Sequence, residues 1–166
     1  MQSREPSAAR ATSEAAILLS LVFGSMVVSG WWLTLQFPLP PLLPSPFDLL
    51  GWVVMTAAAA SLAYSGRILS ARGRGTPYPR RPPRSLVTTG PYARVRNPIL
   101  LSWAAILVGL AFALRISGLL ILLVPTALIV HVYVVVREEP LLARRFGAAF
   151  EDYRRRVPRW IPRLRL

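Results

Sequence analysis

The stretch GPYARVRNP, residues 90–98, combines residue types that could bind an anion at the start of a helix. Gly-Pro predicts a turn, and Asn97 followed by Pro98 is typical of a helix N-cap and the first helical residue. The free N–H groups of a helix N-terminus attract a carboxylate or a phosphate. Arg94 and Arg96 precede this terminus and would add to the attraction. The alternative is that Asn97 serves only as a helix cap.

A pair of adjacent acids, Glu138 and Glu139, follows the last apolar segment of a chain with only seven acidic residues. Carboxylates at the edge of hydrocarbon usually have a cationic partner. The alternative is that they begin a helix, where they would interact favourably with the helix dipole. If the pair lies near the turn at 90–98, the hydrogen-bond donors of the turn face the carboxylates of the pair. A zwitterion with an α-amino and an α-carboxylate group would fit across them.

The rest of the chain indicates an integral membrane protein. It is 54% hydrophobic yet carries a net charge of +13, a combination typical of membrane helices with basic flanks. Four apolar segments approach the roughly 20 residues of a membrane-spanning helix: residues 15–37, 47–66, 98–114 and 116–136. The sequence has no cysteine and one histidine, which excludes disulfides and multi-histidine metal sites. We expect an all-α integral membrane helical bundle of about four transmembrane helices, without a metal ion.

The distribution of arginine predicts the topology. The loop 67–97 holds eight arginines and no acid, and the tail 137–166 holds nine arginines, whereas the connector 38–46 is uncharged. Positive residues favour the cytoplasmic side, so the loop, the tail and both termini are predicted to be cytoplasmic in a bacterial-type inner or plasma membrane. Residues 1–14 are predicted to be a disordered tail, and residues 15–166 a single domain. A cleaved signal peptide is the alternative for the first segment, although its apolar run exceeds a signal core.

The strong basic charge has an explanation in the membrane. Attraction to anionic headgroups accounts for the arginines in the first part of the loop, namely Arg72, Arg74, Arg80 and Arg81. A nucleic-acid-associated protein is the rival interpretation, but no base-reading module is visible in the sequence. We expect membrane lipids and a hydrophobic small molecule or lipid substrate as partners, and no nucleic acid.

The last two apolar segments predict a helical hairpin, because only a short tip around Arg115 separates them. Both ends of such a hairpin lie on the same side of a membrane. The turn at 90–98 and the Glu138-Glu139 pair are therefore predicted to come close together. The tail after Arg137 is predicted to form an amphipathic cytoplasmic helix, with apolar residues at helical spacing: Leu142, Phe146, Phe150 and Tyr153.

SLVTTGPYARVRNP, the hairpin, and REEPLLARRFGAAFEDYRRRVPRWIP together resemble the isoprenylcysteine carboxyl methyltransferase family and the related phospholipid N-methyltransferases. The resemblance covers about residues 84–162. These proteins are integral membrane enzymes that use S-adenosylmethionine at the cytosolic face. The resemblance implies methyl transfer to a hydrophobic or lipid-like acceptor, at O, N or S. The alternative is a non-catalytic lipid-binding or structural membrane protein with the same fold.

Carried over by position, the resemblance implies cofactor-binding and catalytic residues. The cofactor contacts would come from Ser85, Leu86, Val87, Tyr92, Asn97, Pro98, Ile99, Leu100 and Glu138, with Gly109 giving the cofactor room. Arg96 lies inside the same motif and is assigned a catalytic role. If the acceptor must lose a proton, His131 or Glu139 is the candidate base. The alternative for His131 is packing or hydrogen bonding within the membrane helix.

Two residues depart from the pattern of the prenylcysteine enzymes. Those enzymes carry histidine at the position of Asn97, where the phospholipid branch tolerates asparagine. They also place a substrate-binding arginine one turn before the glutamate, at the position of Val134. We therefore expect poor recognition of a prenylcysteine carboxylate.

The predicted topology can be tested by labelling introduced cysteines, since the chain has none of its own. A cysteine at Ser70 should react from the cytoplasmic side and one at Ser45 from the opposite side. Membrane-impermeant maleimide applied to intact cells and to inverted vesicles makes the comparison. Labelling of both positions from outside would overturn the arrangement.

Overall fold

The long helices follow from apolar runs that proline and glycine interrupt. The computed structural model describes residues 8–37, 39–41, 45–46, 48–73 and 84–162. Its elements are α1 (Ala8–Gln36), α2 (Leu49–Gly73), the 3-10 turn η1 (Gly90–Ala93), α3 (Pro98–Ala113), α4 (Ser117–Tyr133), the π-helical segment η2 (Val134–Glu138), α5 (Glu139–Phe146) and α6 (Ala148–Arg156). No strand occurs in these ranges, so the predicted all-α class is confirmed.

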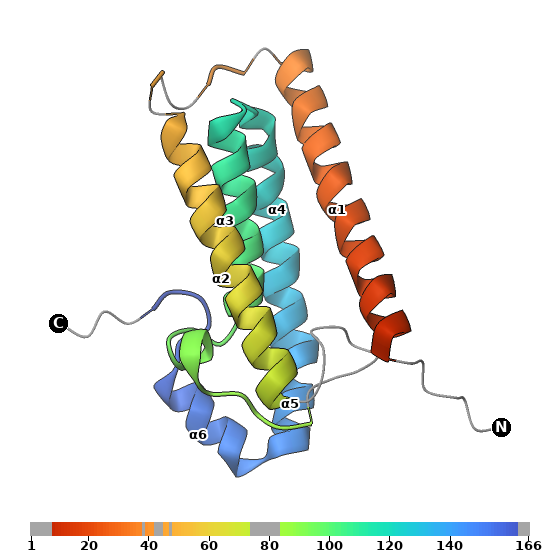
Figure 1. Ribbon diagram of the computed structural model, residues 1–166, viewed down its shortest axis with the longest axis vertical. Helices are drawn as coiled ribbons and strands as arrows, with labels where there is room; N and C mark the ends of the chain where they lie inside the picture. Colours follow the sequence, from red (N-terminus) through yellow and green to blue (C-terminus); the bar gives the residue numbers. More distant parts are fainter. Residues whose placement is uncertain (1–7, 38, 42–44, 47, 74–83, 163–166) are drawn as a thin grey trace.

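The four long helices run side by side in the order α2, α3, α4, α1 (Figure 1). α2 packs along α3, α3 packs against α4, and α1 contacts α4. The hairpin predicted from the sequence is present, with α3 ending at Ala113 and α4 beginning at Ser117. The short elements η1, α5 and α6 gather at the end of the bundle where α2 stops and α3 starts. This end carries the residues that the sequence singles out.

The helices have the length and surface of membrane helices. α2 and the continuous helix Ser117–Phe146, which joins α4, η2 and α5, are long and apolar enough to cross a bilayer, and α3 is apolar but shorter. Large apolar side chains, including Trp31, Trp32 and Trp52, are exposed on the bundle, as a lipid-facing surface requires. These features support a membrane protein, while four spans with cytoplasmic ends remain a prediction.

Two pairs of glycines let helices approach until their backbones touch. A Cβ atom on Gly109 of α3 would lie 2.6 Å from the Met55 nitrogen of α2, and one on Gly51 would lie 2.6 Å from the Gly109 oxygen. Gly30 of α1 meets Gly118 of α4 in a similar way. Small residues at such crossings are a general means of packing membrane helices. The backbone of α2 therefore fills the space beside Gly109 that the sequence analysis assigns to a cofactor.

Polar contacts fix the tip of the hairpin at the opposite end of the bundle. Arg115 pairs with Asp48, just before α2, at 3.0 Å. The Ser117 hydroxyl donates to the Pro40 carbonyl at 2.6 Å. These two contacts hold the tip between α3 and α4 against the connector between α1 and α2.

The structure corrects the predicted N-terminal boundary. α1 begins at Ala8, so residues 8–14 are helical where the sequence analysis expects a disordered tail. Residues 1–7 lie outside the described part of the chain. The helix thus extends beyond the apolar run into residues that include Arg10 and Glu14, which hydropathy alone does not include in a span.

The structure also corrects the tail after Arg137. One amphipathic helix was the expectation, but Gly147, with a φ of +53°, separates α5 from α6. α4, η2 and α5 form one continuous helix, so Glu138 and Glu139 lie inside it. The helix-start interpretation of these two acids is therefore wrong. Their carboxylates must be stabilised by something other than a helix N-terminus.

The close contact between α2 and α3 predicts a stability effect at Gly109. Gly109→Ala should lower the free energy of unfolding by about 1–3 kcal/mol, because the added methyl meets backbone that has to move. Gly66→Ala in α2 is the matched control, since its Cβ would meet nothing within 4 Å. Thermal unfolding of detergent-purified variants is the measurement. If Gly109→Ala leaves stability unchanged but weakens cofactor binding, Gly109 contributes to the cofactor site and not to helix packing.

Candidate active site

The turn η1 forms because Gly90 and Pro91 reverse the chain after the long loop. Gly90 has a φ of +63°, which side chains rarely adopt, and a Cβ there would lie 2.5 Å from the Ile68 side chain. Pro91 accepts a hydrogen bond from the Val95 N–H at 3.1 Å, which closes the turn. The result is a tight turn that sets Tyr92 against α2.

Tyr92 lies in a buried apolar cluster under this turn. The cluster consists of Leu69, Val87 and Tyr92, with Ile68 and Ile99 packed against it. The Tyr153 hydroxyl of α6 donates to the Tyr92 carbonyl at 2.7 Å. The structure thus brings together three of the predicted cofactor-binding residues, from the loop, the turn and the start of α3.

The remaining predicted residues around the turn are more dispersed. Ser85 is exposed, and Leu86 packs against the Phe150 cluster of α6. Asn97 occupies the N-cap position of α3, but its side chain makes no capping hydrogen bond. Pro98 is buried and Leu100 half-buried in the first turn of α3. The Asn97 amide therefore remains able to bind a ligand.

Glu139 is the centre of a buried ion cluster. Its carboxylate accepts a hydrogen bond from Arg96 Nη1 at 2.7 Å, and two from Arg159, at 2.7 Å to Nε and 2.9 Å to Nη2. Burial opposes ionisation of Glu139, but the Arg159 hydrogen bonds and the Arg96 charge outweigh it and lower the pKa of the carboxyl. The cluster confirms that the arginine-rich turn and the acid pair lie together. Its full occupation by arginines gives Glu139 a holding role, and a catalytic role for it remains a prediction.

Glu138, one residue earlier, has the opposite environment. It lies beyond the predicted span, which ends at residue 136, and burial raises its pKa, with the neighbouring Glu139 charge adding to the effect. No hydrogen bond or ion pair to Glu138 occurs within the described ranges. The pKa of Tyr92 is raised by burial, and to a smaller extent by the charges of Tyr153 and Glu138. Glu138 is thus a partly buried carboxylate that a cationic group would stabilise.

Three buried polar side-chain atoms of this region have no hydrogen-bond partner among the described residues: Ser65 Oγ, Tyr92 Oη and Arg96 Nε. Ser65 lies one turn before Leu69 on α2, and Leu69 packs on Tyr92. Leaving a buried donor or acceptor unpaired costs about 1–3 kcal/mol. These atoms and the Glu138 carboxylate are therefore polar groups available to a ligand.

The π-helical segment η2 lies directly before Glu139. It runs from Val134 to Glu138 and widens the helix there. Adjacent side chains point roughly 100° apart in any helix, and the wider turn shifts the direction of both acids relative to the bundle. Glu139 meets the arginines. π-helical turns are rare and occur frequently at functional sites.

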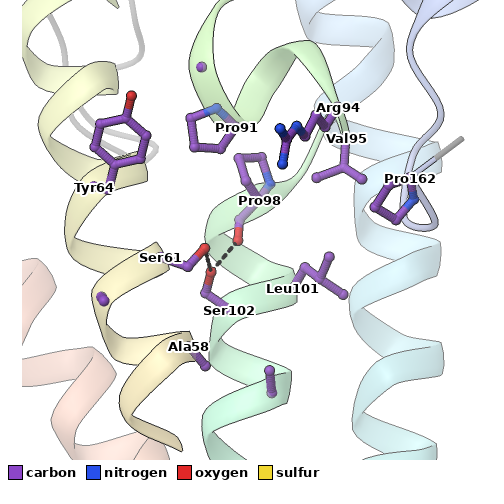
Figure 2. Close-up of a pocket in the computed structure, with 13 residues that line it drawn as sticks. Ala58, Ser61, Tyr64, Pro91, Arg94, Val95, Pro98, Leu101, Ser102 and Pro162 are labelled. Carbon is purple, nitrogen blue, oxygen red and sulfur yellow. Dashed lines mark hydrogen bonds between the residues drawn. The ribbon is translucent and has the colours of Figure 1, made fainter. Parts of the chain in front are cut away.

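A second feature is a pocket of about 740 Å³ between α2, α3 and η1. Figure 2 shows Ala58, Ser61 and Tyr64 of α2 on one side, Leu101 and Ser102 of α3 on another, with Pro91, Arg94 and Pro162 around one end. The two serines bond each other at 3.0 Å, and Ser102 also donates to the Pro98 carbonyl at 2.8 Å. Most of the wall is apolar, and Arg94 is its charged residue.

Comparison with known proteins decides the family. The family model for phospholipid methyltransferases matches residues 49–149, more than half of the chain. The chain belongs to the phospholipid methyltransferase family. The matched segment runs from α2 into α6 and includes η1, the start of α3 and both acids. Membership supports a membrane methyltransferase.

A curated relative matches part of the chain. The nickel-cobalt-cadmium resistance protein NccN of Alcaligenes xylosoxydans xylosoxydans is 37% identical over 81 residues, which is 49% of this chain and 38% of that protein. The chain thus spans well under half the length of this relative. No solved structure matches the chain.

His131 of this phospholipid methyltransferase family member is held by the C-terminal segment. The indole N–H of Trp160 donates to His131 Nδ1 at 2.9 Å. A neutral imidazole whose Nδ1 accepts a hydrogen bond carries its proton on Nε2. Neither nitrogen then has a free lone pair for an incoming proton. The geometry favours the hydrogen-bonding alternative for His131 over the predicted role as a base.

Sequence reasoning missed four residues of this region. Ser65, Tyr153, Arg159 and Trp160 all contact or neighbour the predicted ones. Arg72, assigned to lipid headgroups, donates to Thr89 just before η1, whereas Arg74, Arg80 and Arg81 lie outside the described residues. The motif VPRW after α6 was visible in the sequence, but no spacing rule connects it with residues 20 to 60 positions earlier.

The ion cluster predicts acid sensitivity. The pKa of Glu139 in the folded protein lies below the ordinary value of a glutamate, so its stabilising contribution is present above that ordinary value and lost as the pH falls through the lowered pKa. The midpoint temperature of thermal unfolding should therefore decrease as the pH is lowered from about 6 to about 3. Glu139→Gln should be less stable than the parent at the higher pH and lose less on acidification. Parallel pH curves for the two proteins would contradict the assignment.

Proposed function

We propose that this protein is an S-adenosylmethionine-dependent methyltransferase that modifies a hydrophobic or lipid-like acceptor at the cytoplasmic face of a membrane. The proposal rests on the partly buried Glu138 carboxylate, together with the Tyr92 hydroxyl and Arg96 Nε, two buried atoms without a hydrogen-bond partner among the described residues. All three lie in the segment that matches the family. The membership supports methyl transfer, and the polar groups supply a place for the donor.

The polar and apolar groups at this place fit the parts of S-adenosylmethionine. Glu138 suits its α-ammonium group, because a cation would relieve the cost of the partly buried carboxylate. Arg96 Nε and the Asn97 amide are donors for its α-carboxylate. The apolar cluster of Val87 and Ile99 offers a surface for its less polar part. These residues would hold the methyl donor between the segments that flank η1 and the helix that carries Glu138.

S-adenosylmethionine, when bound, supplies a methyl group already activated by a sulfonium. The protein therefore needs mainly to hold donor and acceptor close and in line, and such positioning is a large part of catalysis. η1 and the ion cluster provide the rigidity, because they fix the Tyr92–Asn97 segment to the acid pair. Apolar side chains around Tyr92 exclude water.

The pocket between α2 and α3 is the proposed place for the acceptor. Its wall shares Pro98 and the η1 turn with the proposed cofactor site. Small residues along α2 and α3 leave room for an apolar chain, and Arg94 at the η1 end suits a polar or anionic group. A lipid or another hydrophobic molecule would reach it from the bilayer.

The surroundings of the candidate bases bear on the acceptor's chemistry. Glu139 is occupied by two arginines, and His131 accepts a hydrogen bond from Trp160. Neither is free to take a proton from a substrate. The arrangement favours an acceptor whose nucleophile is already unprotonated, such as a carboxylate. Arg96, assigned a catalytic role, would act here by orienting the donor.

Removal of the Glu138 charge tests the cofactor site. Glu138→Gln should weaken S-adenosylmethionine binding roughly ten- to a hundredfold, because a charge-assisted hydrogen bond contributes about 1.5–3 kcal/mol. Isothermal titration of detergent-purified protein is the measurement. Glu151→Gln is the matched control, because it makes the same change at a partly exposed acid that pairs with Arg154 on α6. Equal affinity in parent and Glu138→Gln, both folded, would remove Glu138 from the site.

Acceptor selectivity is a separate test. Val134 is buried inside η2, at 1% exposure, where a prenylcysteine-specific enzyme would need an arginine. We expect little or no methylation of N-acetyl-farnesylcysteine and more of other hydrophobic acceptors in a membrane lipid extract. Incorporation of labelled methyl groups, separated by chromatography, is the readout. Efficient methylation of the prenylcysteine compound would refute this selectivity.

A further inference from the structure

Residues 157–162, here termed the C-terminal strap, run back from α6 across the candidate site. Val157 is buried against Phe150 and Tyr153 of α6. The Pro158 carbonyl accepts a hydrogen bond from the Arg96 N–H at 2.9 Å, which joins the strap to the chain just before α3. The strap is therefore attached to the site at its beginning by both apolar packing and a backbone bond.

Two side chains of the strap then contact the long helix on either side of η2. Arg159 makes its paired hydrogen bonds to Glu139, directly after the π-helical segment. Trp160 donates to His131, three residues before that segment begins. The two contacts thus bracket Val134–Glu138, the segment that contains Glu138. Pro162, at the described end of the strap, forms part of the wall of the pocket.

We propose that Arg159 and Trp160 are positioning residues of the methyl-transfer site: by holding η2 at both ends, the strap sets the position of Glu138. This proposal rests on the proposed function. Neither residue lies in the segment that matches the family, which ends at residue 149. Arg159 acts through Glu139, and Trp160 acts through His131.

The chemistry of Arg159 suits this role. Its planar guanidinium binds both oxygens of Glu139, which fixes the carboxylate in orientation as well as in position. Arg96 Nη1 binds the Glu139 Oε1 atom, so one carboxylate couples the strap to the η1 side of the site. A lysine can supply the charge but only a point contact. A lysine at position 159 should therefore preserve only part of the cofactor affinity.

The chemistry of Trp160 differs, because its contact is neutral and depends on one N–H group. Trp160→Phe keeps an aromatic ring beside His131 but removes the donor. The His131 ring would then lose the partner that fixes its orientation in α4. This substitution tests the strap without changing any charge.

The test compares cofactor affinity in variants of the full chain. Titration with S-adenosylmethionine should show about tenfold weaker binding for Arg159→Gln and an intermediate loss for Arg159→Lys. Trp160→Phe should also weaken binding. Arg155→Gln is the control, because Arg155 makes an exposed pair with Asp152 and should change affinity by no more than about twofold. Parent-like binding in folded Arg159→Gln and Trp160→Phe would overturn the proposal.

Hydrogen–deuterium exchange separates this proposal from the proposed function. Amides of Val134–Glu138 should exchange faster in Arg159→Gln and Trp160→Phe than in the parent, and at the parent's rate in Arg155→Gln. This readout does not depend on the cofactor. If the parent binds no S-adenosylmethionine, the proposed function fails, while unchanged exchange in η2 overturns the positioning role. If Arg159→Gln fails to fold, Trp160→Phe decides the outcome by both measurements.

Discussion

The Glu139 carboxylate, buried between Arg96 and Arg159, is the interaction on which the membrane-proximal part of the structure depends. A carboxylate that leaves water must be paired and hydrogen-bonded, and removing one partner of such a cluster typically costs about 3–5 kcal/mol. Here the partners come from three segments that are far apart in the sequence: the turn before α3, the helix that starts with α4, and the C-terminal strap. The ion pairs of this one carboxylate therefore hold the three segments together.

The neighbouring Glu138 has surroundings that differ from those of Glu139. Glu139 has its negative charge compensated by arginines, and its pKa is lowered, whereas the pKa of Glu138 is raised by burial and by that same neighbour. Two identical side chains thus have different surroundings: Glu139 joins three segments, and Glu138 is the group proposed to bind a cation. Adjacent side chains point roughly 100° apart in any helix. The π-helical segment adds to this by shifting the direction of both acids relative to the rest of the bundle.

Much of this arrangement could be predicted from the sequence. The short tip between two apolar runs determined the hairpin, and the hairpin determined that the turn at 90–98 meets the acid pair. Which of the two acids would meet the arginines could not be predicted, because no sequence signal marks the π-helical segment. Gly147 was visible inside the amphipathic run, yet a lone glycine in a helical pattern does not by itself show that the chain turns there. Gly109 was assigned to the cofactor from the resemblance, and its close contact with the backbone of α2 could be seen only in the folded structure.

The most direct measurement of the central claim is methyl transfer itself. The purified protein, in vesicles made from a bacterial lipid extract, would be incubated with S-adenosylmethionine labelled in its methyl group. The organic-soluble fraction would then be counted and separated by chromatography. The account predicts label in a hydrophobic product, formed in proportion to the protein and strongly reduced when Glu138 is replaced by glutamine. Intact, folded protein that transfers no label to any component of the extract or to water-soluble acceptors would contradict it.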